Sequence, residues 1–121
     1  HLADRPDLTT NVFPRTFPPG VSIEVITAST LRQIVALTSE AEDREHVTRY
    51  LYAHAANFTI RNEAAKDDRY SGIVLSVDSP ADLERTQWIA KRLTADTGLD
   101  EVVALAREYL RIGESNDGDC R

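Results

Sequence analysis

The sequence predicts an α/β fold in which a mixed sheet is flanked by helices. Three segments have the composition of strands, and amphipathic helical patterns are interspersed with them. Hydrophobic residues make up 41% of the 121 residues and charged residues 28%, as in folded rather than disordered chains. A chain of this length accommodates one ordinary domain.

We expect three stretches along the chain. Residues 1–20 contain four of the five prolines and should form an extended, loop-like segment, because proline removes backbone donors and keeps its neighbours out of the helical region. Residues 21–112 should form the α/β portion, and the polar residues 113–121 a disordered tail.

The α/β portion opens with a strand pattern at residues 21–26. Apolar and polar residues alternate there and several are β-branched, which predicts one buried face with Glu24 on the polar side. Ser29 or Thr30 is a candidate cap for the short amphipathic helix that follows. Asp43 then begins a second helix, with His46 on the flank of its apolar face.

Two further strand patterns follow the helices. Residues 57–61 alternate and are expected to form an edge strand, followed by a charged loop. Residues 72–77 are almost uniformly apolar, which is typical of a central strand covered on both faces.

The junction after this apolar segment is the most informative local pattern. Asp78 follows directly, and Ser79-Pro80-Ala81-Asp82 combines an N-cap hydroxyl, a proline at the first helical position and an acid in the first turn. Ligands of open α/β sheets bind beyond the carboxyl ends of strands, where a carboxylate can hold a divalent cation against a phosphate. The alternative is that Asp78 only closes a turn or caps the helix. A last amphipathic helix is expected from Asp100.

Composition excludes some classes of partner. The net charge of -6 and the pI near 5.0 disfavour binding to nucleic acid, where affinity comes from Lys and Arg. No apolar run approaches the ~20 residues that span a bilayer, and no signal peptide is visible, so we expect a cytoplasmic protein without a membrane partner. The only cysteine, Cys120, has no thiol with which to pair.

Three motifs occur together and in order: R-T-F-P-P-G at residues 15–20 before the 21–26 strand, D-R-E-H-V-T at 43–48, and V-D-S-P-A-D-L-E at 77–84. Over about residues 11–90 the sequence resembles the C-terminal half of bacterial cytidylyltransferases of the spore coat polysaccharide biosynthesis type. These are related to the acylneuraminate and 3-deoxy-manno-octulosonate cytidylyltransferases. The joint occurrence is more specific than any single motif.

The resemblance implies a Rossmann-like mixed sheet of the nucleotide-diphospho-sugar transferase type and usually a homodimer. It implies that CTP is joined to a sugar or sugar acid with release of pyrophosphate, that Asp78 is one of two carboxylates holding Mg²⁺, and that Arg15, Glu24 and His46 lie near the acceptor. Each also has a plain alternative. Arg15 is a surface charge beside prolines, Glu24 a solvent-facing strand residue, and His46 a helix-flank histidine bonded to backbone.

The sequence also departs from that family. The glycine- and arginine-containing loop that cradles the CTP phosphates is not recognisable, and the five glycines are scattered. The chain begins at His1 and contains no methionine. We therefore expect a partial fold that lacks the N-terminal nucleotide-binding half and is inactive alone. The alternative is a non-catalytic dimerisation or regulatory module derived from that scaffold.

Overall fold

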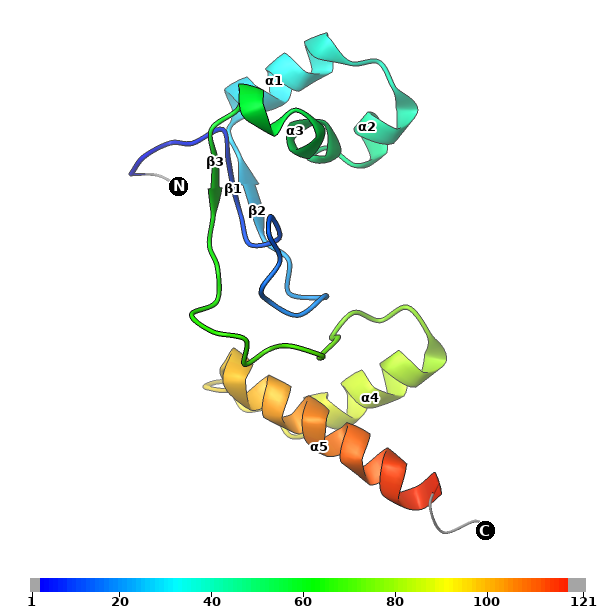
Figure 1. The fold of residues 1–121 in the computed structure, drawn as a ribbon. Coiled ribbons are helices and arrows are strands. Elements are labelled where there is room, and N and C mark those ends of the chain that lie inside the picture. Colours follow the sequence, from blue (N-terminus) through cyan, green and yellow to red (C-terminus); the bar gives the residue numbers. More distant parts are fainter. Residues whose placement is uncertain (1–2, 118–121) are drawn as a thin grey trace. The chain divides into compact units, whose positions relative to one another are not determined.

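The structure is a computed structural model that describes residues 3–117, and it consists of two compact units (Figure 1). Unit 1 is formed by the chain up to Phe17 together with Ser22–Lys66. Unit 2 is formed by Pro18–Val21 together with the chain from Asp67 onward. Each unit has its own hydrophobic core.

Unit 1 contains a three-stranded mixed sheet in the order β2-β1-β3 (Figure 1). Strand β1 (Leu8–Thr10) is antiparallel to β2 (Glu24–Ile26) and parallel to β3 (Ile60–Asn62). The outer position of β3 confirms the expected edge strand, although it begins later than the predicted segment 57–61. The mixed α/β architecture predicted from the sequence is confirmed.

The helices of unit 1 are short. They are α1 (Ala28–Leu37), α2 (Ala41–Glu45), α3 (Arg49–Ala53) and the 3-10 turn η1 (Ala55–Asn57). Their apolar faces meet β1, so that the side chains of Leu8, Ile34 and Leu51 form the core.

The cap of α1 differs from the expectation. Thr27, rather than Ser29 or Thr30, is the N-cap, and its hydroxyl accepts a hydrogen bond from the Thr30 backbone at 3.1 Å. The Thr30 side chain is buried instead, and its hydroxyl donates to Asp7 Oδ1 at 2.7 Å. The helix therefore begins before both predicted capping residues.

Unit 2 is built around two helices, α4 (Pro80–Ala90) and α5 (Leu99–Asp117). Ile73 from the preceding loop packs with Ile89, Val103 and Ala106 to form the core. Trp88 lies at the margin of this core, with its ring edge-on to Tyr109 at a centroid distance of 5.5 Å.

The expected central strand at 72–77 is wrong: among the described residues this segment pairs with no strand. The Leu75 backbone N–H donates to the Pro19 carbonyl at 2.7 Å, but no ladder forms. Ile73 is buried, whereas Val74 and Val77 are 47% and 48% exposed. Burial on both faces along the segment, inferred from its composition, therefore does not occur.

Both ends of the chain also differ from expectation. The segment 1–20, expected to be extended and loop-like, contributes the central strand β1, in which the alternating Leu8 and Thr10 side chains are buried. Helix α5 continues to Asp117, where a disordered tail was expected from residue 113. The rest of that predicted tail, including Cys120, lies outside the described residues.

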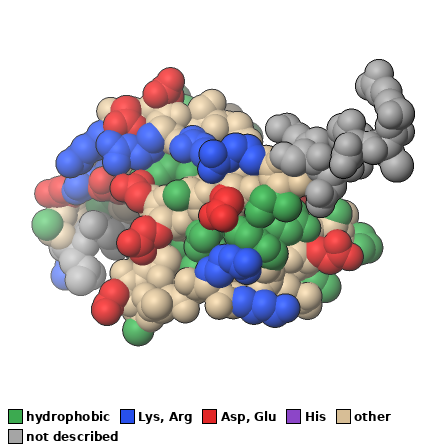
Figure 2. Space-filling view, turned by 90° about the horizontal axis from the view of Figure 1, so that it is seen from below, with side chains coloured by type: hydrophobic (Ala, Val, Ile, Leu, Met, Phe, Trp, Pro, Cys, Tyr) green, Lys and Arg blue, Asp and Glu red, His purple; other side chains and the backbone are tan. Residues whose placement is uncertain are grey.

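Several apolar side chains of unit 2 lie at its surface. Leu83 and Leu93 are 48% and 41% exposed. Helix α4 ends at Ala90, before Leu93. Figure 2 shows hydrophobic side chains at the surface between charged ones. Within residues 3–117, no helix is both long and apolar enough to cross a membrane.

Candidate functional site

Asp78 is an exposed carboxylate immediately before the start of α4. Its Oδ2 atom accepts a hydrogen bond from the Ser76 hydroxyl at 2.9 Å, and its backbone N–H donates to Asp82 Oδ2 at 3.2 Å. The residue thus precedes the N-cap, and its side chain does not cap the helix. This removes the helix-cap alternative for Asp78 and leaves a carboxylate that solvent and ligands can reach.

The helix start itself is made by Ser79 and Asp82. The Ser79 hydroxyl accepts from the Asp82 backbone at 3.2 Å and donates to Asp82 Oδ2 at 2.7 Å, which satisfies helix donors that have no partner within α4. These hydrogen bonds, with those of the Asp78 backbone and Arg85, lower the pKa of the Asp82 carboxyl. Asp82 is therefore a structural carboxylate, as the sequence predicts.

Arg85 fixes the segment that leads to Asp78. Its guanidinium donates to Asp82 Oδ1 at 2.7 Å and to the Ser76 carbonyl at 2.9 Å, and its side chain is only 12% exposed. Its Nε is buried without a hydrogen-bond partner among the described residues. Nothing in the local sequence marks this role except the spacing of Asp82 and Arg85, which places them on one helix face.

The donor set near Asp78 suits a hard cation but is incomplete. Carboxylate oxygens are the ligands that Mg²⁺ prefers, and such sites often use one or two carboxylates together with water and substrate phosphates. Within the described part of the chain, no group of three or more His, Cys, Asp or Glu side chains is placed to hold a metal. Asp78 alone fits a cation held mainly by phosphate oxygens.

The other three candidate residues belong to unit 1. Arg15 is exposed, and its guanidinium donates to the Ser22 hydroxyl at 3.1 Å. Ser22 lies two residues before Glu24, so Arg15 and Glu24 are held by the same stretch of extended chain.

Glu24 accepts a short hydrogen bond from the Tyr52 hydroxyl, which also lies 2.9 Å from Thr10 Oγ1. Burial and the Glu24 carboxylate raise the pKa of Tyr52 to about 12, because both disfavour the phenolate. The Phe13 ring packs on Tyr52 at a centroid distance of 4.8 Å. Sequence reasoning missed Tyr52, since it is 28 positions from Glu24 and no local pattern connects them.

The histidines of unit 1 differ in their surroundings. His46 ends α2, is exposed, and within residues 3–117 its imidazole has no hydrogen-bond partner, so it remains accessible to a ligand. The His54 ring stacks on the Tyr50 ring at a centroid distance of 4.1 Å, and its Nδ1 atom lies 3.0 Å from the Tyr50 backbone carbonyl oxygen, as expected of a structural residue.

The motif residue Asp43 has a structural role. Its buried carboxylate accepts from the Thr38 hydroxyl at 2.7 Å and pairs with Arg49 at 2.6 Å. The hydrogen bond from Thr38, reinforced by Arg49, lowers the pKa of the Asp43 carboxyl. The ion pair between Asp43 and Arg49 thereby connects α2 to α3.

Comparison with solved structures finds a similar fold in a cytidylyltransferase from Leptospira borgpetersenii serovar Hardjo-bovis (strain JB197). The TM-score is 0.79 and the sequence identity 24%, over 91% of this chain and 46% of the matched chain. The chain thus spans less than half the length of that enzyme and shares the fold of the matched part. No protein-family model and no curated protein matches the sequence.

Proposed function

We propose that this chain is the C-terminal portion of a CTP-dependent nucleotidyltransferase that activates a sugar or sugar acid for surface polysaccharide biosynthesis. The observation that carries the proposal is the fold match to a cytidylyltransferase, which coincides with the three motifs found in the sequence. The spore coat polysaccharide type is the specific assignment that the motifs favour. The complete enzyme is a cytoplasmic homodimer in this proposal.

Asp78 is the proposed ligand of Mg²⁺. The cation supplies charge that neutralises the phosphate oxygens of CTP when it is bound. Ser76 and Arg85 hold the segment around Asp78, so the carboxylate faces solvent from a fixed backbone.

Arg15, Glu24 and His46 are the proposed contacts of the sugar or sugar acid. The Arg15 guanidinium can pair with a carboxylate of the substrate, and Glu24 can accept hydrogen bonds from sugar hydroxyls. Tyr52 fixes one oxygen of Glu24 and leaves the other for a substrate hydroxyl. The exposed His46 can donate to or accept from a further polar group.

Cation binding at Asp78 can be tested on the chain alone. Mn²⁺, a paramagnetic substitute for Mg²⁺, should broaden the amide resonances of residues 76–79 in the presence of CTP, and excess Mg²⁺ should reverse the effect. Asp78→Asn should abolish the broadening. Asp96→Asn, in an exposed loop between α4 and α5, is the matched control and should leave it unchanged. Equal broadening in wild type and Asp78→Asn would remove the metal role.

The chain should release no pyrophosphate from CTP and Mg²⁺ with candidate sugars. One carboxylate without a phosphate-cradling loop lacks the preorganised charge that phosphoryl transfer needs. Turnover by the chain comparable with that of the Leptospira enzyme would refute the half-enzyme assignment.

The second candidate is a non-catalytic dimerisation or regulatory module. It is favoured by the exposure of Val74 and Val77 in an unpaired extended segment, since open edges and apolar surfaces are commonly covered by association. The two functions differ in one measurement. A module should dimerise without any response to CTP, whereas a nucleotidyltransferase portion should respond to CTP and Mn²⁺ at residues 76–79.

A further inference from the structure

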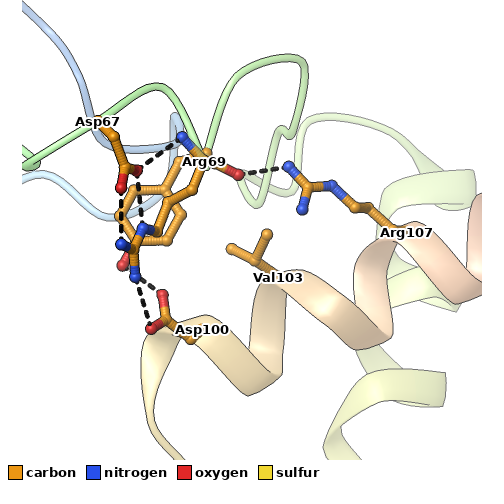
Figure 3. A pocket seen from close by; sticks show the side chains of 6 residues that line it. Asp67, Arg69, Asp100, Val103 and Arg107 are labelled. Atoms are coloured by element: carbon orange, nitrogen blue, oxygen red, sulfur yellow. Dashed lines mark hydrogen bonds and ion pairs between the residues drawn. The ribbon is translucent and has the colours of Figure 1, made fainter.

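Unit 2 contains a cleft between the loop at residues 67–70 and the first turns of α5 (Figure 3). Its volume is about 370 Å³, and it is lined by the side chains of Asp67, Arg69, Tyr70, Asp100, Val103 and Arg107. This volume lies in the range of roughly 300–1,000 Å³ that small-molecule sites occupy. None of these residues belongs to the candidate site described above.

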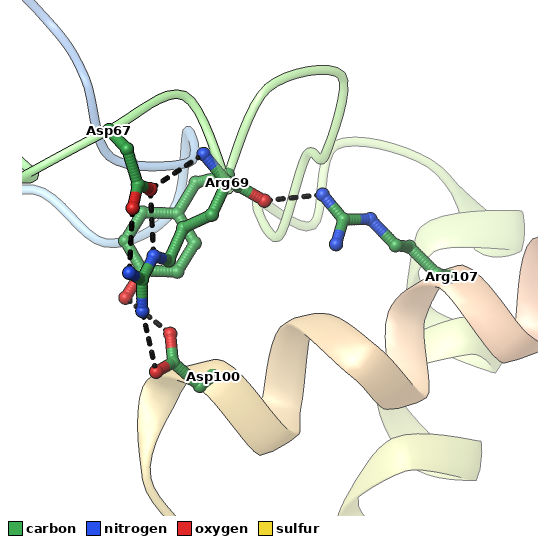
Figure 4. Close-up of polar contacts among 5 residues, drawn as sticks. Asp67, Arg69, Asp100 and Arg107 are labelled. Atoms are coloured by element: carbon green, nitrogen blue, oxygen red, sulfur yellow. Dashed lines mark hydrogen bonds and ion pairs between the residues drawn. The ribbon is translucent and has the colours of Figure 1, made fainter.

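One side of the cleft is an ion cluster in which Arg69 bridges two carboxylates. Arg69 donates to both oxygens of Asp67, at 2.7 and 2.6 Å, and to Asp100 Oδ2 at 3.3 Å (Figure 4). The Tyr70 hydroxyl donates to Asp100 Oδ1 at 2.6 Å. The hydrogen bonds from Arg69 lower the pKa of the Asp67 carboxyl to about 2, so this carboxylate is charged near neutral pH.

Arg107 differs from Arg69, because it pairs with no carboxylate among the side chains that the structure describes. Its guanidinium donates to the Arg69 backbone carbonyl, as Figures 3 and 4 show, and that partner is neutral. The α5 positions three and four residues away are Val103, Ala104, Leu110 and Arg111, none of them acidic. Among residues 3–117, Arg107 forms no ion pair.

A guanidinium carries five N–H donors in a planar fork that matches a carboxylate or phosphate. One donor of Arg107 is used by the Arg69 carbonyl, and this bond holds the guanidinium at the cleft. We propose that the cleft binds a small oxyanion, either a carboxylate or a phosphate group, which pairs with Arg107 while its apolar part rests on Val103 and the Tyr70 ring. The cluster of Asp67, Asp100 and Arg69 keeps one net negative charge, but its carboxylates are bonded to Arg69 and Tyr70 and lie on the other side of the cleft from Arg107 (Figure 4).

The test is a titration of the full chain observed by NMR through the Val103 methyl groups and the Arg107 Nε–H. Sodium phosphate and sodium acetate are the two probes, with sodium chloride at matched ionic strength as the control. We expect saturable shifts with a Kd on the order of millimolar for phosphate, acetate or both, as for one charge-assisted contact at a surface. Saturation by phosphate alone identifies a phosphate site, and saturation by acetate alone a carboxylate site.

Arg107→Gln should weaken binding by about tenfold or more, and Arg107→Lys should have an intermediate effect, because it keeps the charge and loses the fork. Arg92→Gln is the matched control, since Arg92 lies over the Trp88 ring, 3.5 Å from its centroid, and does not line the cleft. The Tyr70 amide shift of each variant shows whether the loop is intact. No saturation by either anion, an equal response to chloride, or unchanged affinity in Arg107→Gln would overturn the proposal.

Discussion

Replacing Gly20 with alanine should destabilise unit 2 strongly. Gly20 has a φ of +98°, a conformation that residues with a side chain rarely adopt. An added Cβ would lie 2.4 Å from the backbone nitrogen of Ser76 and 2.5 Å from the carbonyl carbon of Leu75. These are backbone atoms, so relief of the clash requires the segment before Asp78 to move.

The magnitude follows from two contributions. The left-handed conformation costs alanine roughly 1–2 kcal/mol, and a clash in a packed region typically adds about 1–3 kcal/mol. Alanine also reduces the conformational entropy of the unfolded chain, which offsets about 0.4–1 kcal/mol of this destabilisation. The net loss in the free energy of unfolding should therefore be about 3 kcal/mol.

Gly72→Ala is the matched control. Gly72 also has a positive φ, +74°, but an added Cβ would meet nothing within 4 Å. Its cost should be about 1 kcal/mol, from the conformation alone. Urea unfolding followed by the fluorescence of Trp88, which packs against the core of unit 2, measures both variants. If Gly20→Ala is no more destabilising than Gly72→Ala, the close approach of Gly20 to residues 75–76 is not present in solution.

Three further predictions concern single groups. Acid should destabilise the fold between about pH 4 and pH 2. The folded-state pKa of Asp67, about 2, lies below its ordinary value of 3.8. The contribution of Asp67 to the free energy of unfolding is therefore present above about pH 4 and is lost as the pH falls. Urea unfolding at several pH values tests this, and a contribution of Asp67 that is unchanged at pH 2, judged against Asp67→Asn, would contradict it. Glu24→Gln should lower the pKa of Tyr52 from about 12 towards 10, measured by phenolate absorbance, although burial should keep it above 10; an unchanged value would mean that the two side chains are apart in solution. Ser79→Ala should lower the free energy of unfolding by about 1 kcal/mol, because the N-cap hydrogen bond is lost. Ser79→Asn should lower it much less, because asparagine also caps helices. Equal losses for the two variants in thermal unfolding would argue against capping.

The features predicted correctly from the sequence depend on neighbours in the chain. The α4 start was read from Ser79, Pro80 and Asp82, and the structure confirms each role, because the hydrogen bonds join residues at most four positions apart. The edge position of the strand predicted near residues 57–61 was likewise correct.

The features predicted wrongly depend on distant partners. Strand β1 lies among prolines, and it is identified only by its pairing with β2 and β3, which no local pattern reveals. The apolar segment 72–77 has strand composition, but a strand requires a partner ladder, and within the described residues none is provided. The sequence does not indicate the role of Tyr52 for the same reason, since its contact with Glu24 depends on tertiary structure.

The proposed metal role of Asp78 agrees with the hydrogen bonds at the start of α4. Both oxygens of Asp82 are engaged, one by Arg85 and the other by Ser79 and the Asp78 backbone. Arg85 also holds the Ser76 carbonyl, so the backbone on both sides of Asp78 is fixed. Only one oxygen of Asp78 accepts a hydrogen bond within the described residues, from Ser76, and its side chain is exposed. Helix capping therefore uses Asp82 and leaves Asp78 available, which is the arrangement that a cation-binding carboxylate requires.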